Sequence, residues 1–496
     1  MESVAKNILT ESRRSQKLMI WTDCDREGEN IGLEVMNVAR QGNRGLQDTD
    51  IKRARFNNTE RSHIINAARN PINLNIPMAM SVEARMEIDL RVGAAFTRFQ
   101  TKLLKSRFPV LGNTDVISYG TCQFPTLSFV VDRYKRVKSF ESEPFWTLTI
   151  TVEKDGIKVN FKWERGNIFD RLAVLVLYEQ SLLTRPDNIE IQNMISKPKS
   201  KWRPLPLTTV ELQKIGSRYF KLSAKRVLDI AEELYTKGFV SYPRTETDQF
   251  DKAMNLKKLI EKQFVSTEWG HYANQLIHDD KYREPRRGKN NDNAHPPIHP
   301  IAYVARGALP SSDHYNVYKL IAQHFLACCS DDAKGMQTTV TAKWAHQIFY
   351  ASGLMVVSRN FLDVYPYTKW ESSSALPYFE RGEIVDLHST EMKEGSTSAP
   401  EYLTEAELIS LMDINGIGTD ATMADHINTV IERQYVMKVD PTGNLITEHA
   451  HSGGFNDNSS NNNNNRTKRN TKGRRKGRDE ADGSDSHDGP ASVVTD

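Results

Sequence analysis

The 496-residue sequence contains only four cysteines, and none of them belongs to a Cys-x-x-Cys pair. Zinc sites commonly use such pairs, and disulfide frameworks need a denser set of cysteines in a short chain. We therefore expect neither a zinc site nor a disulfide framework, and we expect a protein of a reducing compartment.

Long apolar runs and a strong net charge are also missing. Charged residues interrupt every apolar run and no leader-like segment opens the chain, so we expect no membrane span and no membrane partner. The formal net charge is +3, so any surface for nucleic acid must be a local basic patch. The length predicts about three or four domains.

The first clear pattern is an apolar run followed by acidic residues. Leu18–Thr22 is typical of a buried strand, and Asp23, Asp25 and Glu27 follow at alternate positions. If the extended geometry continues, the three carboxylates share one side and repel one another, which favours a hard cation such as Mg²⁺ between them. The alternative is an acidic turn, or acidic residues at the start of the following helix.

The second pattern is a tyrosine that follows a predicted helix. Ser223 is a suitable N-cap for this helix, and Gly238 is placed to end it. Pro243 keeps Tyr242 out of helical geometry, and in an extended segment Arg244 lies on the same side as the phenol.

A tyrosine beside an arginine can attack a phosphodiester. The phenol of Tyr242 supplies the nucleophile, and the guanidinium of Arg244 can hold the phosphate through forked hydrogen bonds. The alternative is a surface turn, in which Tyr242 packs on Pro243 and Arg244 pairs with Glu246.

The loop 290–300 holds three prolines around His295. The prolines favour a stiff, extended loop that would present His295 at a defined position. A histidine there could donate to a phosphate or transfer a proton, although many loop histidines are simply exposed.

Three further segments carry polar groups near predicted helices. Residues 81–104 form a long helical pattern with an unusual load of charge, which is also typical of a solvated face. Gln123 and Thr126, at the start of another helix, could donate to phosphates. The glycines of the segment 416–422 could let a nucleic-acid backbone approach a helix start, or could form a plain helix connection.

Two strand-rich segments flank a helical block. Alternating apolar residues predict strands over 144–163, with a hairpin turn at Asp155-Gly156, and again over 337–357. The helical block 207–329 is therefore inserted between them. A further helix begins at Thr404, where Thr404-x-x-Glu407 fits a capping box.

The last part of the chain, from about residue 449, is of low complexity. It contains a polyasparagine run (461–465), a basic segment (466–478) and an acidic segment (479–488). Such a composition predicts disorder, and the basic half could touch DNA or act as a nuclear-import signal.

Six motifs in one order resemble the type IA DNA topoisomerases, most closely the eukaryotic topoisomerase III group. They are Asp-Cys-Asp-Arg-Glu-Gly-Glu (23–29), Glu-Ile-Asp-Leu-Arg-Val-Gly-Ala-Ala-Phe-Thr-Arg-Phe-Gln-Thr (87–101), Cys-Gln-Phe-Pro-Thr-Leu (122–127), Ser-Tyr-Pro-Arg-Thr (241–245), Ala-His-Pro-Pro-Ile-His-Pro (294–300) and Gly-Ile-Gly-Thr-Asp-Ala-Thr (416–422).

The resemblance implies a multidomain α+β toroid. The implied parts are a partial TOPRIM α/β domain (1–70), a helical DNA-groove domain (71–140 and 401–448), a β-rich arch (141–206 and 333–400), an inserted helical domain that carries the tyrosine (207–332), and a disordered tail (449–496).

The resemblance also implies roles for single residues. Tyr242 matches the nucleophile that forms a 5′-phosphotyrosyl bond, Arg244 matches the arginine that orients the scissile phosphate, and His295 matches a histidine near it. The implied Mg²⁺ ligands are Asp23, Asp25 and Glu27, and the implied DNA contacts are Arg91, Gln100, Gln123, Thr126, Thr419 and Asp420.

The activity implied is cleavage and religation of one DNA strand without ATP, which relaxes negative supercoils and resolves recombination or replication intermediates. The implied partners are single-stranded DNA, a RecQ-type helicase and an OB-fold accessory protein, and the implied location is the nucleus.

The sequence departs from the family pattern in one respect. The family's TOPRIM domain begins with a strand that supplies a catalytic glutamate, whereas only 22 residues precede Asp23 here, and the family chain also continues beyond Val436. We therefore expect a chain that is short at both ends. A second hypothesis is a catalytically impaired fragment that binds single-stranded DNA. Another TOPRIM enzyme, such as a primase or nuclease, would explain 23–29 but not 241–245.

Overall fold

The structure is a computed structural model that describes residues 2–57, 61–113, 116–373, 376–420, 422–440, 444–445 and 492–494. Most of the low-complexity tail predicted over 449–496, including the basic segment 466–478, lies outside these described residues. No helix in the described part of the chain is both long enough and apolar enough to cross a membrane.

The N-terminal unit is a small α/β layer. Strands β1 and β2 pair in parallel, with Leu18 opposite Ile51, and both strands pack on α2. Asp25 caps α2 because its carboxylate accepts the backbone N–H of Gly28 at 2.7 Å. The predicted strand is therefore confirmed, but it ends before the acidic residues. The elements are α1 (Glu2–Ser12), β1 (Leu18–Ile20), α2 (Arg26–Gly42), β2 (Ile51–Arg53) and α3 (Arg61–Arg69).

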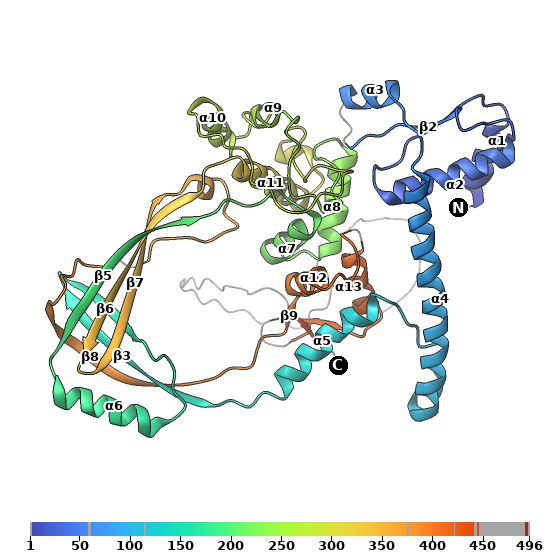
Figure 1. Ribbon diagram of the computed structural model, residues 1–496. Coiled ribbons are helices and arrows are strands. Elements are labelled where there is room, and N and C mark those ends of the chain that lie inside the picture. The colour runs from blue at the N-terminus through green and yellow to red at the C-terminus, as the bar shows by residue number, and fades with distance from the viewer. Residues whose placement is uncertain are drawn as a thin grey trace, which may run out of the picture.

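The long helix α4 extends away from this unit (Figure 1). It begins after the N-cap Asn75 and runs over Ile76–Arg107, which is longer at both ends than the predicted 81–104. Its first turns bury Ala79 and Val82, while most of its later apolar side chains are exposed. The short 3-10 helix η1 (Pro109–Asn113) follows it.

Helices α5, α12 and α13 form a separate core although they are distant in sequence. Val130, Leu408 and Ile427 are among its buried residues. Thr404 and Glu407 make the predicted capping box at the start of α12. The elements are α5 (Gln123–Lys138), β9 (Leu403–Thr404), α12 (Glu405–Ile414), α13 (Met423–Glu432), β10 (Met437–Val439) and β11 (Ser492–Val494), and β11 lies between β10 and β9.

The two predicted strand-rich segments join in one closed antiparallel barrel. The strand order is β3-β4-β7-β6-β5-β8. Asp155 and Gly156, at φ 53° and 75°, form the predicted hairpin turn between β3 and β4. The elements are β3 (Pro144–Lys154), β4 (Ile157–Trp163), α6 (Arg171–Thr184), β5 (Asn188–Lys201), β6 (Ala333–Trp344), β7 (Gln347–Ser358), η3 (Asn360–Asp363) and β8 (Ile384–Ser396).

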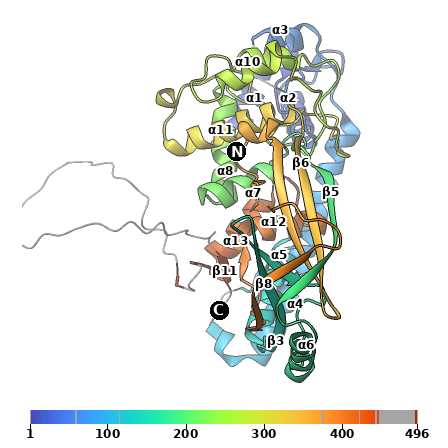
Figure 2. The ribbon, with the colours of Figure 1, turned by 90° about the vertical axis from the view of Figure 1, so that its left-hand side faces the viewer.

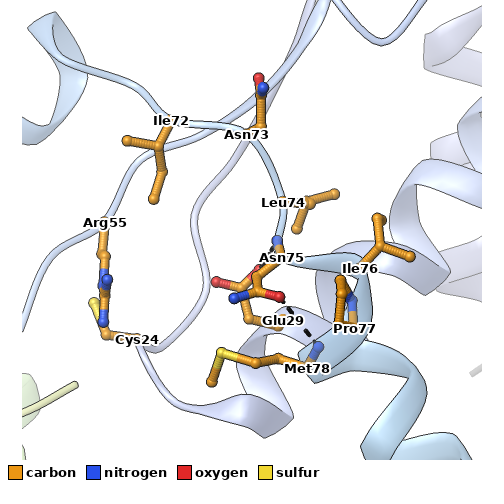
Figure 3. A pocket seen from close by; sticks show the side chains of 10 residues that line it. All are labelled: Cys24, Glu29, Arg55, Ile72, Asn73, Leu74, Asn75, Ile76, Pro77 and Met78. Carbon is orange, nitrogen blue, oxygen red and sulfur yellow. Dashed lines mark hydrogen bonds between the residues drawn. The ribbon is translucent and has the colours of Figure 1, made fainter. Parts of the chain in front are cut away.

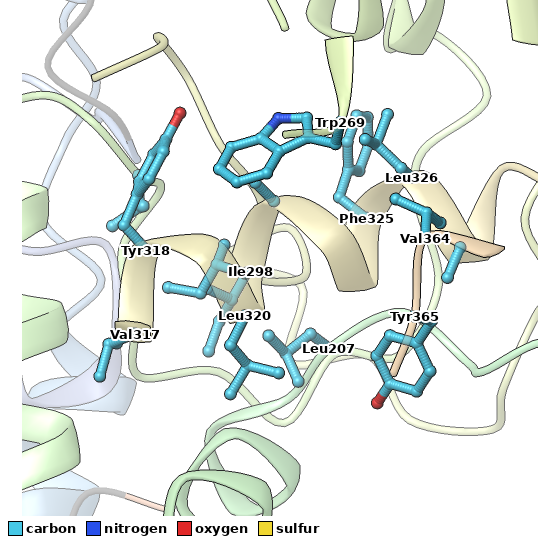
Figure 4. Packing of buried hydrophobic residues seen from close by; sticks show 14 of the residues in the cluster. Leu207, Trp269, Ile298, Val317, Tyr318, Leu320, Phe325, Leu326, Val364 and Tyr365 are labelled. Atoms are coloured by element: carbon cyan, nitrogen blue, oxygen red, sulfur yellow. The ribbon is translucent and has the colours of Figure 1, made fainter. Parts of the chain in front are cut away.

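The helical block between β5 and β6 has the largest core. Helix α11 lies through its centre and is surrounded by buried side chains such as Leu207, Trp269 and Ile298 (Figure 4). Ser223 caps α8, and Gly238 at φ 79° follows its end, as predicted. The elements are α7 (Thr209–Phe220), α8 (Ala224–Thr236), α9 (Leu256–Glu261), α10 (Gly270–His278), η2 (Arg306–Ala308) and α11 (Ser312–Cys328).

These parts follow one another around a ring. In Figure 1 the barrel lies on one side, the α7–α11 block above, and α5, α12 and α13 close the ring below that block. In Figure 2 the barrel strands run from the α7–α11 block to α6 at the opposite end. The block also touches α12 and α13 directly, because Val210 and Ala224 belong to their core.

Candidate active site

Tyr242 is buried where the α7–α11 block meets the N-terminal unit. Only 7% of the residue is exposed, and its hydroxyl donates to Asp25 Oδ2 at 3.3 Å. The ring centroids of His295 and Tyr235 lie 4.4 and 5.3 Å from its own. Burial, and then the charges of Asp25 and Asp23, raise the pKa of Tyr242 far above its ordinary value, so the phenol is protonated at neutral pH.

Arg244 lies two residues further along the same extended segment and is half-buried. Its Nε and one terminal nitrogen contact Glu232 Oε1 on α8 at 2.6 and 2.5 Å. Burial lowers the pKa of Arg244, but Glu232 more than offsets this, so the net pKa is raised and the guanidinium keeps its charge. The surface-turn alternative is therefore wrong, because Tyr242 is buried and Arg244 pairs with Glu232 instead of Glu246.

His295 is held by the loop in which it lies. Its side chain is 1% exposed, and its Nδ1 lies 3.6 Å from Asp292 Oδ2. The Asp292 carboxylate also accepts the backbone N–H groups of Ala294 and His295, both at 2.8 Å, and the hydroxyl of Thr245 at 3.1 Å. Burial would raise the pKa of Asp292, but the nearby His295 side chain and the two backbone N–H groups outweigh it and lower the pKa below its usual range. The histidine is thus buried against Tyr242 and is not an exposed loop residue.

The three acidic residues that were predicted to share one side do not do so. Asp25 begins α2, and Glu27, in the first turn of that helix, forms an ion pair with Arg85 on α4 at 2.9 Å. Asp23 remains near Asp25, and burial followed by the Asp25 charge raises the pKa of Asp23. Among the described residues, no group of three His, Cys, Asp or Glu side chains is arranged to hold a metal ion. The alternate spacing fails because the strand ends at Ile20.

A buried arginine on strand β2 holds the loop that carries Asp23 in place. Arg53 is fully buried and pairs with Glu29 at 2.9 Å. It also donates to the backbone carbonyls of Gly28, at 3.1 Å, and Asp23, and to the hydroxyl of Thr22. The loop that carries Asp23 is therefore tied to strand β2.

The predicted DNA contacts on α4 are already engaged within the chain. Arg91 is exposed and pairs with Glu87 one turn earlier. The side-chain amide of Gln100 donates to the backbone carbonyl of Ile117 at 2.7 Å. Arg91 can therefore exchange its partner for a phosphate at the surface, whereas Gln100 holds the segment that follows η1.

The predicted contacts on α5 and before α13 differ in accessibility. Thr126 is fully buried and its hydroxyl donates to the carbonyl of Cys122 at 2.7 Å, so it presents no group to a DNA strand in this structure. Gln123 accepts a hydrogen bond from Arg433 at 2.7 Å, and its buried amide nitrogen has no partner among the described residues. Thr419 and Asp420 are half-buried, and the Thr419 backbone N–H donates to a nearby threonine hydroxyl at 2.9 Å.

Two cavities adjoin the acidic loop. Cys24 and Arg55 line both of them. The smaller, of about 430 Å³, has these two residues on one side and Asn75, Pro77 and Met78 on the other (Figure 3). No predicted catalytic side chain lines this smaller cavity; the larger one reaches His295.

Comparison with known protein families identifies the family to which the chain belongs. A family described as DNA topoisomerase matches residues 73–451, and the Toprim domain family matches residues 1–59. The chain belongs to the type IA DNA topoisomerase family. This confirms the resemblance carried by the six motifs.

The relatives include proteins named DNA topoisomerase 3. The protein from Schizosaccharomyces pombe is 52% identical over 91% of this chain and 71% of its own length. The protein from Saccharomyces cerevisiae is 48% identical over 88% of this chain and 71% of its own length. DNA topoisomerase 3-alpha of Homo sapiens is 46% identical over 87% of this chain and 42% of its own length.

The likeness also extends to the fold. Full-length topoisomerase I from Thermotoga maritima superposes with a TM-score of 0.70 and 22% identity, over 90% of this chain and 70% of that one. The predicted fold class, a type IA toroid of mixed helix and sheet, is confirmed.

The motifs did not reveal two residues that organise the site. Glu232 holds Arg244 and Asp292 holds His295. A signal for Asp292 was present, since an Asp in a loop commonly accepts the backbone N–H two residues on in an Asx turn, as Asp292 does from Ala294. The pairing of Glu232 with Arg244 had no such local signal.

Proposed function

We propose that this protein cuts one strand of DNA through Tyr242 and rejoins it without ATP. The observation that supports this most strongly is the hydrogen bond between the buried Tyr242 hydroxyl and Asp25, which are 217 positions apart in the sequence. A buried phenol that donates to a carboxylate, packs on a histidine and lies two residues from a charged arginine is suited to nucleophilic attack on phosphorus.

In the cleavage step Tyr242 Oη forms a bond to the scissile phosphorus while the bond from phosphorus to the 3′ oxygen breaks. The phenol proton passes toward Asp25, which already accepts it in a hydrogen bond, and the leaving 3′ oxygen takes up a proton from water to become the 3′-hydroxyl. His295, whose ring packs on Tyr242, and Arg244, two residues further along the chain, stabilise the charge that develops on the phosphate. The phosphotyrosine retains the energy of the phosphodiester, so the reverse attack by the 3′-hydroxyl needs no ATP.

Mg²⁺ is the metal that best fits the acidic loop. Asp23 and Asp25 repel one another in a partly desolvated position, and Mg²⁺ is commonly held by one or two carboxylates together with phosphate oxygens. Bound there, the cation would neutralise charge on the two carboxylates and the phosphate. Glu27 would join this set only after leaving Arg85.

The single strand would approach through the face formed by α4, α5 and the start of α13. We assign Arg91, Gln123 and the Thr419–Asp420 turn to that face, while Gln100 and Thr126 support it from within. After cleavage, the domain 207–332 would move away from the ring and let a second strand pass, which relaxes negative supercoils and resolves recombination or replication intermediates.

The finer assignments follow the likeness to the topoisomerase III group. We propose a nuclear protein that works with a RecQ-type helicase and an OB-fold accessory protein. The named relatives are all eukaryotic, which supports this assignment.

Covalent trapping tests the proposal. The purified chain is incubated with Mg²⁺ and a 3′-labelled single-stranded oligonucleotide, denatured rapidly, and examined for DNA attached to protein. We expect adducts with the unaltered chain and none with Tyr242→Phe, because the substitution removes only the nucleophilic oxygen.

Two controls sharpen the result. Chelation of Mg²⁺ should abolish the adduct, and a gel shift should show that Tyr242→Phe still binds the oligonucleotide. Intact binding by the unaltered chain without any adduct would contradict the proposed activity and leave a DNA-binding protein.

A further inference from the structure

A larger cavity, of about 760 Å³, lies beside His295 at the junction of the N-terminal unit and the α7–α11 block. The N-terminal unit contributes Arg55 and Phe56 to its lining, and the block contributes Phe250, Lys252 and Arg287. Its volume falls within the range of small-molecule and nucleotide sites, about 300–1,000 Å³.

Among the described residues that line this cavity, basic side chains outnumber acidic ones. Arg55 donates to the backbone carbonyl of Asn293 at 2.8 Å, and Arg287 donates to Gln249 Oε1 at 3.2 and 2.8 Å. Within the described part of the chain, both guanidinium groups are thus positioned by neutral oxygens, which leaves their positive charge available to an anion. Lys252 is exposed at the rim, and Asp251 is the acidic side chain among the lining residues.

The cavity adjoins the catalytic site and is lined by other residues than those of the predicted DNA face. His295 lines the cavity and its ring packs on Tyr242. The predicted contacts on α4, α5 and before α13 do not line it. A strand that crosses Tyr242 from the α4 face would therefore enter this cavity on the other side of the scissile phosphate.

We propose that this cavity binds the first nucleotides of the strand that becomes attached to Tyr242. The proposal rests on the proposed cleavage reaction, which leaves a 5′-phosphate on Tyr242 and a 3′-hydroxyl on the other fragment. Arg287, Lys252 and Arg55 contact the phosphates, and the half-buried ring of Phe56 offers a face for stacking a base.

The domain to which the lining residues belong indicates which of the two DNA fragments the cavity holds after cleavage. Most of them, over 247–254 and 287–296, lie in the same domain as Tyr242. When that domain moves away from the ring, these residues move with the tyrosine, so the fragment linked to the tyrosine stays bound to them. The fragment with the 3′-hydroxyl stays on the α4 face.

The test compares substrates shortened on one side of the cut. The cut is first mapped on a long 3′-labelled oligonucleotide, and adduct yield is then measured with one to eight nucleotides downstream of it, and separately with a shortened upstream side. Lys252→Ala/Arg287→Ala is compared with the unaltered chain. Lys258→Ala is the matched control, because Lys258 is an exposed α9 lysine that does not line the cavity.

With the unaltered chain and with Lys258→Ala, we expect the adduct yield to rise several-fold as the downstream side lengthens from one to about three nucleotides, the span of two or three phosphates. The double variant should lose about tenfold in yield on long substrates and lose this dependence on downstream length. Shortening the upstream side should affect all three proteins equally. If the double variant melts early, Lys252→Gln and Arg287→Gln are used singly.

The experiment distinguishes an error in the proposed subsite from an error in the proposed cleavage reaction. No adduct from the unaltered chain on any substrate overturns the cleavage reaction itself. Adducts whose yield is independent of downstream length, or equal in the double variant, overturn the subsite alone. A variant defect that follows upstream length assigns the cavity to the other fragment and overturns the proposal as stated.

Discussion

His295 owes its position to Asp292, three residues earlier in the same loop. The carboxylate of Asp292 accepts hydrogen bonds from two backbone N–H groups and from the Thr245 hydroxyl, and it lies beside the His295 imidazole. It therefore connects the histidine loop to the segment that carries the tyrosine. Because Asp292 contacts the histidine that packs on Tyr242, we regard it as a positioning residue.

Replacing Asp292 with Asn should lower the yield of covalent adduct about tenfold, the effect of losing one hydrogen bond to a charged group, about 1.5 kcal/mol. Binding of single-stranded DNA, measured by gel shift, should not change. Glu246→Gln serves as the control, since it removes an exposed carboxylate from the same stretch of chain. Equal adduct yields in the two variants would show that Asp292 does not act on the histidine.

The same variant has an expected dependence on pH. The pKa of Asp292 is lowered in the folded protein, so its stabilising effect is complete above the unfolded pKa of about 4 and is lost as the pH falls below it. Asp292→Asn should therefore melt earlier than the unaltered chain at pH 7, and the difference should shrink toward pH 3. A gap in melting temperature that stays constant with pH would contradict this assignment.

Strand β2 supports the acidic loop through one side chain, Arg53. The strand is short, yet its last residue contacts Glu29 and the Gly28 carbonyl in the first turn of α2, and two groups of the loop before α2. The loop between β1 and α2 has no regular secondary structure, so the position of Asp23 depends on this arginine and on the hydrogen bond from Cys24 Sγ to the Phe56 carbonyl at 2.7 Å.

Arg53→Met should destabilise the N-terminal unit by about 3–5 kcal/mol, because it leaves the Glu29 charge buried without its partner. Thermal melting followed by circular dichroism measures this loss. Arg40→Met is the matched control: Arg40 pairs with the exposed Asp48, and breaking such a surface pair costs less than about 1 kcal/mol. Equal melting temperatures for the two variants would show that the Arg53 network contributes little.

The ring is closed by contacts that the proposed reaction must break. The helical block is joined to α12 and α13 by the hydrogen bond from the Ala224 backbone to Glu405, at 2.7 Å, and by the Lys225–Asp425 ion pair, at 2.9 Å. Tyr242–Asp25 joins it to the N-terminal unit. Opening the ring for strand passage requires these contacts to separate together, whereas cleavage does not.

Linking the block to α13 should therefore separate the two steps. Lys225→Cys and Asp425→Cys are joined by a reducible bismaleimide in a Cys122→Ser background, since the other three cysteines are buried. We expect the linked protein to form adducts with short oligonucleotides within about twofold of the unlinked protein. Its rate of relaxing a negatively supercoiled plasmid should fall at least about tenfold, because raising the activation free energy of opening by about 1.4 kcal/mol already slows the rate tenfold.

Reduction of the linker should restore relaxation. Lys225→Cys alone, treated with the same reagent, controls for the modification itself. A linked protein that relaxes plasmid at the normal rate would show that strands pass without separation at this contact.

Local sequence determined the elements and the chemical groups of this protein. The cap of α8, the capping box of α12, the Asp155-Gly156 hairpin and the extended segment at Tyr242 each depend on residues within about five positions, so their chemistry could be read directly. The six motifs are also short stretches of local sequence, and they identified the family and its toroidal fold.

The tertiary structure decided which of those groups meet. Closure of the barrel from two separated strand segments, the contact of Tyr242 with Asp25, and the pairing of Glu27 with Arg85 and of Arg244 with Glu232 all depend on how distant segments pack. The expected row of three carboxylates failed for the same reason: a strand keeps its alternation only while it has a partner strand, and β1 ends with β2, so the chain turns into α2 at Asp25.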